Sequence, residues 1–183
     1  MIIVLSSCVH LDEETSDDQE VEVFLTNEVV YKFLDPVNIE KPVDMLQKIE
    51  GRYGDTEFSL LIYVKADSDK SEMIILNDFA SELARITYSE GRALASGLVA
   101  EAGLSAEYIM ADFQLAYFKA RIISNSLSAS GLSFTEYSEG DKIVREILDG
   151  KKLIIHIEKN TDSLYFNNIL RDYSYLITYG ESE

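Results

Sequence analysis

Hydrophobic and polar positions alternate along most of the chain, which is the pattern of short β-strands. The clearest run spans residues 56–66, and four of its apolar side chains share one face: Phe58, Leu60, Ile62 and Val64. A Gly-Asp pair separates it from residues 45–53, so the two runs predict a hairpin. Further strand candidates lie at residues 21–34, 73–77, 83–89, 92–100, 143–148, 153–158 and 173–179. Such a meander predicts a sandwich or a barrel-like antiparallel sheet.

The period changes at Ser105, which we interpret as a helix N-cap. Ile109, Phe113 and Tyr117 follow at helical spacing, and the helix that they predict is apolar on almost every side. A helix without a polar face must lie against or inside other elements. A second helical stretch follows at residues 120–127. We therefore predict a mainly β fold (α+β), in which residues 106–127 form helices across the concave face of a curved antiparallel sheet.

Composition narrows the possible functions. The chain has 183 residues and a formal net charge of −17, which argues against binding to nucleic acids and against electrostatic adhesion to anionic lipids. No stretch approaches the ~20 apolar residues of a transmembrane helix. His10 and His156 are too few and too far apart in sequence to suggest a metal site, and we expect no cofactor. The chain shows no nucleophile elbow or phosphate-binding glycine loop, so we do not expect an enzyme.

The N-terminus resembles the end of a bacterial lipoprotein signal. Residues 1–8 form a short apolar run that ends in Leu5-Ser6-Ser7-Cys8, similar to a lipobox. Residues 9–20 are acidic and would serve as a solvated tether, and residues 21–183 would form one domain. The alternative is a first strand with a buried, inert Cys8. The tether favours lipidation of Cys8, and Val9 in place of an aspartate favours the periplasmic face of the outer membrane.

Three stretches carry a resemblance to a known family. They are the helix motif at residues 111–119 (ADFQLAYFK), Arg145 followed by Gly150, and a closing strand at residues 173–177 (YSYLI). Together they resemble poorly characterised outer-membrane lipoproteins that share the fold of LolA and LolB. Phe118 and Lys119 stand where that family has Trp-Pro, and without the proline we expect the helix to continue through Lys119.

The resemblance implies an incomplete antiparallel β-barrel, plugged by helices, with an apolar cavity between the two. It also implies an association with the export of lipid-like or aryl-polyene products. The chain would bind or transfer a lipid-like ligand, such as an acyl chain or a lipoprotein, as a monomer. The expected cavity residues come from the strands and from the first helix: Phe58, Leu60, Ile62, Ile86, Ile109, Phe113 and Tyr117.

Three polar residues leave alternatives open. Asp112 and Gln114 would either contact a ligand headgroup or bond backbone groups where the helix meets the sheet. Arg145 would either pair with Asp112 and lock helix to sheet, or be an exposed strand charge. Four tyrosines near the C-terminus would line a ligand site or only pack the sheet: Tyr165, Tyr173, Tyr175 and Tyr179.

Two other functions remain open beside the lipid carrier. A protein-interaction module would show an exposed apolar patch without a cavity, whereas a cavity large enough for a chain favours the carrier. An enzyme acting on lipid would show a buried polar cluster with perturbed pKa values at a cavity mouth.

Overall fold

A ten-stranded, entirely antiparallel sheet dominates the computed structural model, which describes residues 23–98 and 105–180. Its spatial order is β7-β6-β5-β4-β3-β12-β11-β10-β9-β8, so the first half of the chain and the last half meet at the β3–β12 pair. The strands are β3 (Val43–Tyr53), β4 (Thr56–Ala66), β5 (Ser71–Leu76), β6 (Glu82–Ser89), β7 (Arg92–Gly97), β8 (Ser133–Glu139), β9 (Lys142–Asp149), β10 (Lys152–Lys159), β11 (Ser163–Asn168) and β12 (Tyr173–Tyr179). The end strands β7 and β8 do not pair, so the sheet is not closed.

The hairpin predicted between residues 45–53 and 56–66 is confirmed, and a second one joins the strand candidates at residues 143–148 and 153–158. Residues 54 and 55 join β3 to β4, and the Asp149-Gly150 pair joins β9 to β10. Gly150 has φ +60°, a conformation that side-chain-bearing residues rarely adopt and that tight hairpin turns require. Glycine at this position therefore fixes the turn.

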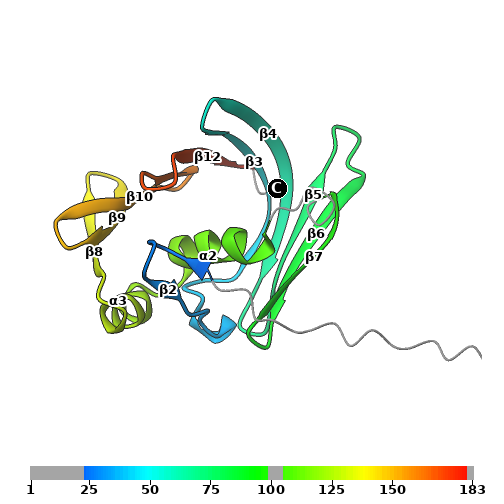
Figure 1. Cartoon of the computed structure of the whole chain (residues 1–183). Helices are drawn as coiled ribbons and strands as arrows, with labels where there is room; N and C mark the ends of the chain where they lie inside the picture. Colours follow the sequence, from blue (N-terminus) through cyan, green and yellow to red (C-terminus); the bar gives the residue numbers. More distant parts are fainter. Residues whose placement is uncertain (1–22, 99–104, 181–183) are drawn as a thin grey trace, which may run out of the picture.

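One face of the sheet is concave and carries the core. The register aligns Leu60 with Ile49 and Ile177, and it aligns Ile62 with Ile75. Since directly opposed residues point to the same side, the predicted apolar face of β4 belongs to this continuous inner layer. Ile86 on β6 belongs to the same layer, because it lies opposite Met73 on β5, which in turn lies opposite Val64 on β4. Figure 1 shows the sheet curving around helix α2 (Ala106–Tyr117), which lies inside the curve.

Helix α2 begins as the sequence predicts, because the Ser105 hydroxyl accepts a hydrogen bond from the Tyr108 amide. Its end contradicts our expectation of a helix continuing through Lys119. Phe118 is extended (φ −90°, ψ 161°), and α3 (Ala120–Ala129) starts after it. Backbone hydrogen bonds with residues 38–40 take the place of helical ones here. The Lys119 amide donates to the Asn38 carbonyl, and the Glu40 amide donates to the Tyr117 carbonyl. This short bridge breaks the helix without a proline.

Other differences lie at weakly patterned segments. The predicted strands within residues 21–34 are the two-residue β1 (Val23–Phe24) and β2 (Val30–Tyr31), which pair with each other and not with the large sheet. A 3-10 turn, Pro36–Asn38, follows them. Strands β8 and β11 were not predicted. The lipobox-like segment with Cys8 and the acidic tether lie outside the described residues.

Candidate functional site

Helix α2 is fixed to the sheet at its C-terminal end by a buried arginine. Arg145, on β9, is 1% exposed, and its Nη1 donates to the carbonyl oxygens of Leu115 and Ala116 at 2.8 and 2.9 Å. These carbonyls belong to the last turn of α2, where no helical amide is available to bond them. A cation at this end also interacts favourably with the negative end of the helix dipole. Arg145 therefore caps the helix from the neighbouring sheet.

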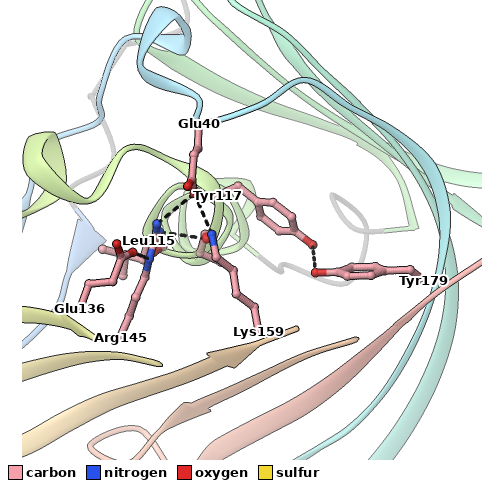
Figure 2. Close-up of polar contacts among 8 residues, drawn as sticks. Glu40, Leu115, Tyr117, Glu136, Arg145, Lys159 and Tyr179 are labelled. Atoms are coloured by element: carbon pink, nitrogen blue, oxygen red, sulfur yellow. Dashed lines mark hydrogen bonds and ion pairs between the residues drawn. The ribbon is translucent and has the colours of Figure 1, made fainter. Parts of the chain in front are cut away.

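Two glutamates and a lysine complete this cluster (Figure 2). Arg145 Nε donates to Glu136 Oε2 at 2.7 Å, and Arg145 Nη2 lies 3.3 Å from Glu40 Oε2. Lys159 Nζ donates to the same Glu40 oxygen at 2.8 Å. Burial would raise the pKa of Glu40, but the hydrogen bond from Lys159 and the two cations lower it below its ordinary value. Burial and the Arg145 charge lower the pKa of Lys159.

The expected pairing of Arg145 with Asp112 is therefore wrong, and so is the alternative of an exposed charge. Arg145 bonds Glu136, Glu40 and two helix carbonyls. It locks helix to sheet through partners that the sequence did not indicate, since Glu40 lies 105 residues away in the chain.

Gln114 is a fully buried amide with a structural role. Its Oε1 accepts hydrogen bonds from the Tyr31 hydroxyl at 3.1 Å and the Leu34 amide at 2.9 Å, while its Nε2 donates to the Leu34 carbonyl at 3.0 Å. Tyr88 donates to the same carbonyl. Gln114 thus fastens the segment after β2 to α2 and satisfies its own buried polar atoms.

Asp112 is surrounded by tyrosines from β12. The Tyr173 hydroxyl lies 2.9 and 2.8 Å from the two carboxylate oxygens of Asp112, and the Tyr175 hydroxyl lies 3.5 Å from one of them. Burial raises the pKa of Asp112 to about 7, although the bonds from both tyrosines and the charge of Arg171 act in the opposite direction. Burial and the neighbouring carboxylate also raise the pKa of Tyr173 and of Tyr175. Asp112 therefore changes charge near neutral pH.

Tyr117, at the end of α2, forms a second link to β12. Gln47 donates from its Nε2 to the Tyr117 hydroxyl at 3.2 Å, and Tyr117 donates to the Tyr179 hydroxyl at 3.3 Å. Figure 2 shows the two hydroxyls pointing toward one another, Tyr117 from α2 and Tyr179 from β12. The Phe113 ring stacks on Tyr117 with centroids 4.7 Å apart. Phe113 itself is only 5% exposed and belongs to the core.

The expected cavity residues lie in three different surroundings. Ile62, Ile86 and Phe113 are buried in the core. Phe58 lies farther along β4, where its ring occupies the space above Gly51. A half-buried set remains on the concave side, packed against the core, which we call the inner surface: Ile49, Leu60, Ile109, Tyr117, Tyr175 and Tyr179.

A separate hollow of about 610 Å³ lies beside the tips of β3 and β4 and the adjoining parts of β11 and β12. Most side chains that line it point away from the concave side according to the register: Glu50, Arg52, Glu57, Ser59, Tyr165, Ser174 and Leu176. Tyr165 therefore lies apart from the other C-terminal tyrosines.

The outward face of the last strands carries His156. Its Nε2 lies 3.0 Å from Glu158 and its Nδ1 lies 3.6 Å from Glu146. Within residues 23–98 and 105–180, no group of His, Cys, Asp and Glu is arranged to hold a metal ion. None of the described helices is both long and apolar enough to cross a membrane.

The family model of DUF3261, described as a protein of unknown function, matches residues 44–180. The chain belongs to this family. The matched part of this DUF3261 protein runs from β3 to the end of β12 and includes α2 and α3. Asp112, Gln114, Arg145 and the inner surface all lie within it. No curated protein matches the chain.

Proposed function

We propose that this DUF3261 protein is a lipoprotein on the periplasmic face of the outer membrane that binds or transfers a lipid-like apolar ligand. The ligand would lie along the inner surface, between α2 and the strands β3, β4 and β12. In this proposal the open sheet and its helices correspond to the incomplete barrel of the LolA and LolB fold.

The observation that carries the proposal is the incomplete burial of the inner surface. Side chains that face a helix across a sheet normally end up buried, as Ile62 and Ile86 are at 6% and 1% exposure. Leu60, Ile109 and Tyr175 keep solvent contact on the same concave side. Apolar surface that remains wet is stabilised by covering it, at about 25 cal/mol per Å². An acyl chain would provide that cover.

A second candidate, an enzyme acting on lipid, is favoured by one observation. Asp112 is a half-buried carboxyl whose pKa is raised to about 7, which is the range of a general acid or base. Its hydrogen-bond partners among the described residues are Tyr173 and Tyr175, so none of these partners is a serine, histidine or lysine. Such a set orients a polar group more readily than it generates a nucleophile, so binding is the better proposal.

The binding proposal is tested with two adjacent leucines of β4. Leu60 faces the inner surface and Leu61 faces outward, and both are half-buried. Leu60→Asn should weaken binding of N-phenyl-1-naphthylamine, a neutral apolar probe, about tenfold, because it replaces apolar contact by a polar group. Leu61→Asn, the matched control, should leave binding unchanged. Absence of binding by the wild type, or equal losses in both folded variants, would exclude the inner surface as the site.

The anchoring part of the proposal has its own test. The complete open reading frame is expressed in a bacterial host that is fed a labelled fatty acid, and the label should appear on the protein and disappear in Cys8→Ala. Label that survives the substitution, or no label on the wild type, would refute lipidation at Cys8.

A further inference from the structure

The hydrogen bonds around Asp112 all run toward its carboxylate. Asn168 Nδ2 donates to the Tyr173 hydroxyl at 3.2 Å, so that hydroxyl directs its own hydrogen at Asp112. Tyr175 donates to the same carboxylate. Asn168 is 2% exposed, so this series of hydrogen bonds starts at a buried side chain. In its ionised form Asp112 is therefore held as an acceptor.

The acceptor capacity of Asp112 is only partly used. An ionised carboxylate offers about four lone pairs, whereas each tyrosine hydroxyl has one hydrogen to donate. Tyr173 and Tyr175 thus supply at most two hydrogen bonds, and the second is long at 3.5 Å. Among the described residues, no backbone amide and no basic side chain donates to Asp112. Asp112, Tyr173 and Tyr175 are each half-buried, so this cluster keeps some contact with solvent.

Three basic residues near α2 already have hydrogen-bond partners among the described residues: Arg145, Lys159 and Arg171. Arg145 and Lys159 bond Glu40 and Glu136 at the other end of α2. Arg171 is the cation near Asp112, and its guanidinium bonds the Phe24 carbonyl and the Tyr108 hydroxyl and lies 4.8 Å from the centre of the Tyr108 ring. The partners of Arg171 are neutral groups, and its charge acts on the Asp112 carboxylate. An anionic headgroup at Asp112 would therefore meet a carboxylate, and among the described residues no basic side chain donates to that carboxylate to offset the repulsion.

We propose that Asp112, Tyr173 and Tyr175 select the polar end of the ligand, and that this end donates a hydrogen bond to Asp112. The ligand would be a long apolar molecule that ends in a hydroxyl or amide group, rather than in a carboxylate or phosphate. This inference rests on the proposed function, because it assigns the headgroup contact of the same inner surface. The raised pKa of Asp112 agrees with it, since a poorly solvated carboxylate gains most from an added donor.

The test compares three ligands with the same dodecyl chain at pH 8, each displacing N-phenyl-1-naphthylamine from the protein. They are 1-dodecanol, its methyl ether, which accepts but does not donate, and dodecanoic acid. Wild type should bind the alcohol about tenfold more tightly than the ether and the acid. In Asp112→Asn the preference of alcohol over acid should fall about tenfold, because the charge that repels the acid is gone. The ether comparison needs no variant and holds even if Asp112→Asn does not fold.

The outcomes separate this inference from the function on which it rests. If the apolar probe binds but the alcohol, ether and acid displace it equally, or the acid displaces it best, the headgroup role of Asp112 is wrong and the carrier proposal stands. If neither the probe nor any dodecyl ligand binds, the carrier proposal fails, and the headgroup role fails with it.

Discussion

Two charged side chains with different surroundings attach α2 to the sheet. Arg145 is buried, but two carboxylates and two carbonyl oxygens accept its hydrogen bonds. A buried charge is tolerated when it is paired in this way. Asp112 receives only hydroxyl donors, and burial raises its pKa to about 7. Arg145 therefore fixes the helix, whereas the Asp112 carboxylate keeps lone pairs that could accept further hydrogen bonds.

The raised pKa of Asp112 makes stability depend on pH. Its ordinary pKa is 3.8, so between pH ~4 and ~7 the folded state binds a proton that the unfolded state has lost. The contribution of this residue to stability is therefore present at low pH and is lost as pH rises through about 7. In Asp112→Asn this loss cannot occur. The free energy of unfolding of the variant, relative to wild type, should rise by on the order of 2 kcal/mol from pH ~5 to pH ~8.

Urea denaturation at several pH values measures this difference, with Asp67→Asn as the control. Backbone hydrogen bonds from Asp69 and Lys70 lower the pKa of Asp67 below 3.8. Its protonation therefore lies below pH ~5 in both states, and the difference between Asp67→Asn and wild type should not change from pH ~5 to ~8. A flat difference for Asp112→Asn would contradict the raised pKa.

The elements show which parts of this fold a sequence can predict. Strands β4 and β6 and helix α2 have strong periodicity; both strands were predicted nearly to their ends, and the helix was predicted from its N-cap but not at its end. Strand β8 has mostly exposed polar residues and offers no alternation of apolar side chains to detect. Strand β11 alternates, but Asn168 occupies one of its buried positions. Local pattern identifies elements that bury a continuous apolar face, and it misses those that are ordered by their neighbours.

The candidate site could be predicted only in part for a related reason. Asp112, Gln114 and Arg145 were found because polar residues in or beside an apolar helix motif need partners. Their partners come from distant segments: Tyr31 lies 83 residues from Gln114, and Tyr173 lies 61 residues from Asp112. Such pairings depend on the order of the strands in the sheet, which the alternation of apolar and polar residues along the chain does not determine. Glu40 and Lys159 were missed because each looks like an ordinary exposed charge in the sequence.

The break between α2 and α3 should accept the proline that we expected to be necessary for it. Lys119 has φ −57°, which proline can adopt, and Phe118 before it is already extended. Lys119→Pro loses the hydrogen bond from the Lys119 amide to the Asn38 carbonyl and an exposed one from Nζ to the Val37 carbonyl. It also restricts the unfolded chain, so its effect on the free energy of unfolding should stay below about 1 kcal/mol. Asn125→Pro, at an exposed position inside α3, should cost about 3 kcal/mol. Equal costs in thermal or urea denaturation would contradict this account of the break.

On the scale of the whole molecule, an open sheet leaves two edges. Strand β7 ends one side of the sheet and β8 ends the other. Edge strands expose backbone groups that can pair with another chain, and charged residues discourage such pairing. Strand β8 carries Glu139 as well as Glu136, whose carboxylate bonds Arg145, and the chain has a net charge of −17. Repulsion between copies therefore supports the expectation of a monomer.

Amide hydrogen exchange tests this expectation along the whole sheet. Strands β3 and β12 have neighbours on both sides, so their amides should be among the slowest to exchange. Strand β8 has one neighbour, and six of its seven residues are exposed, so about every second amide in it should exchange fast. Since a monomer has no concentration-dependent contact, this contrast should be the same in dilute and concentrated protein. Protection of β8 that appears only at high concentration would show that copies pair through this edge, and the monomer would then be wrong.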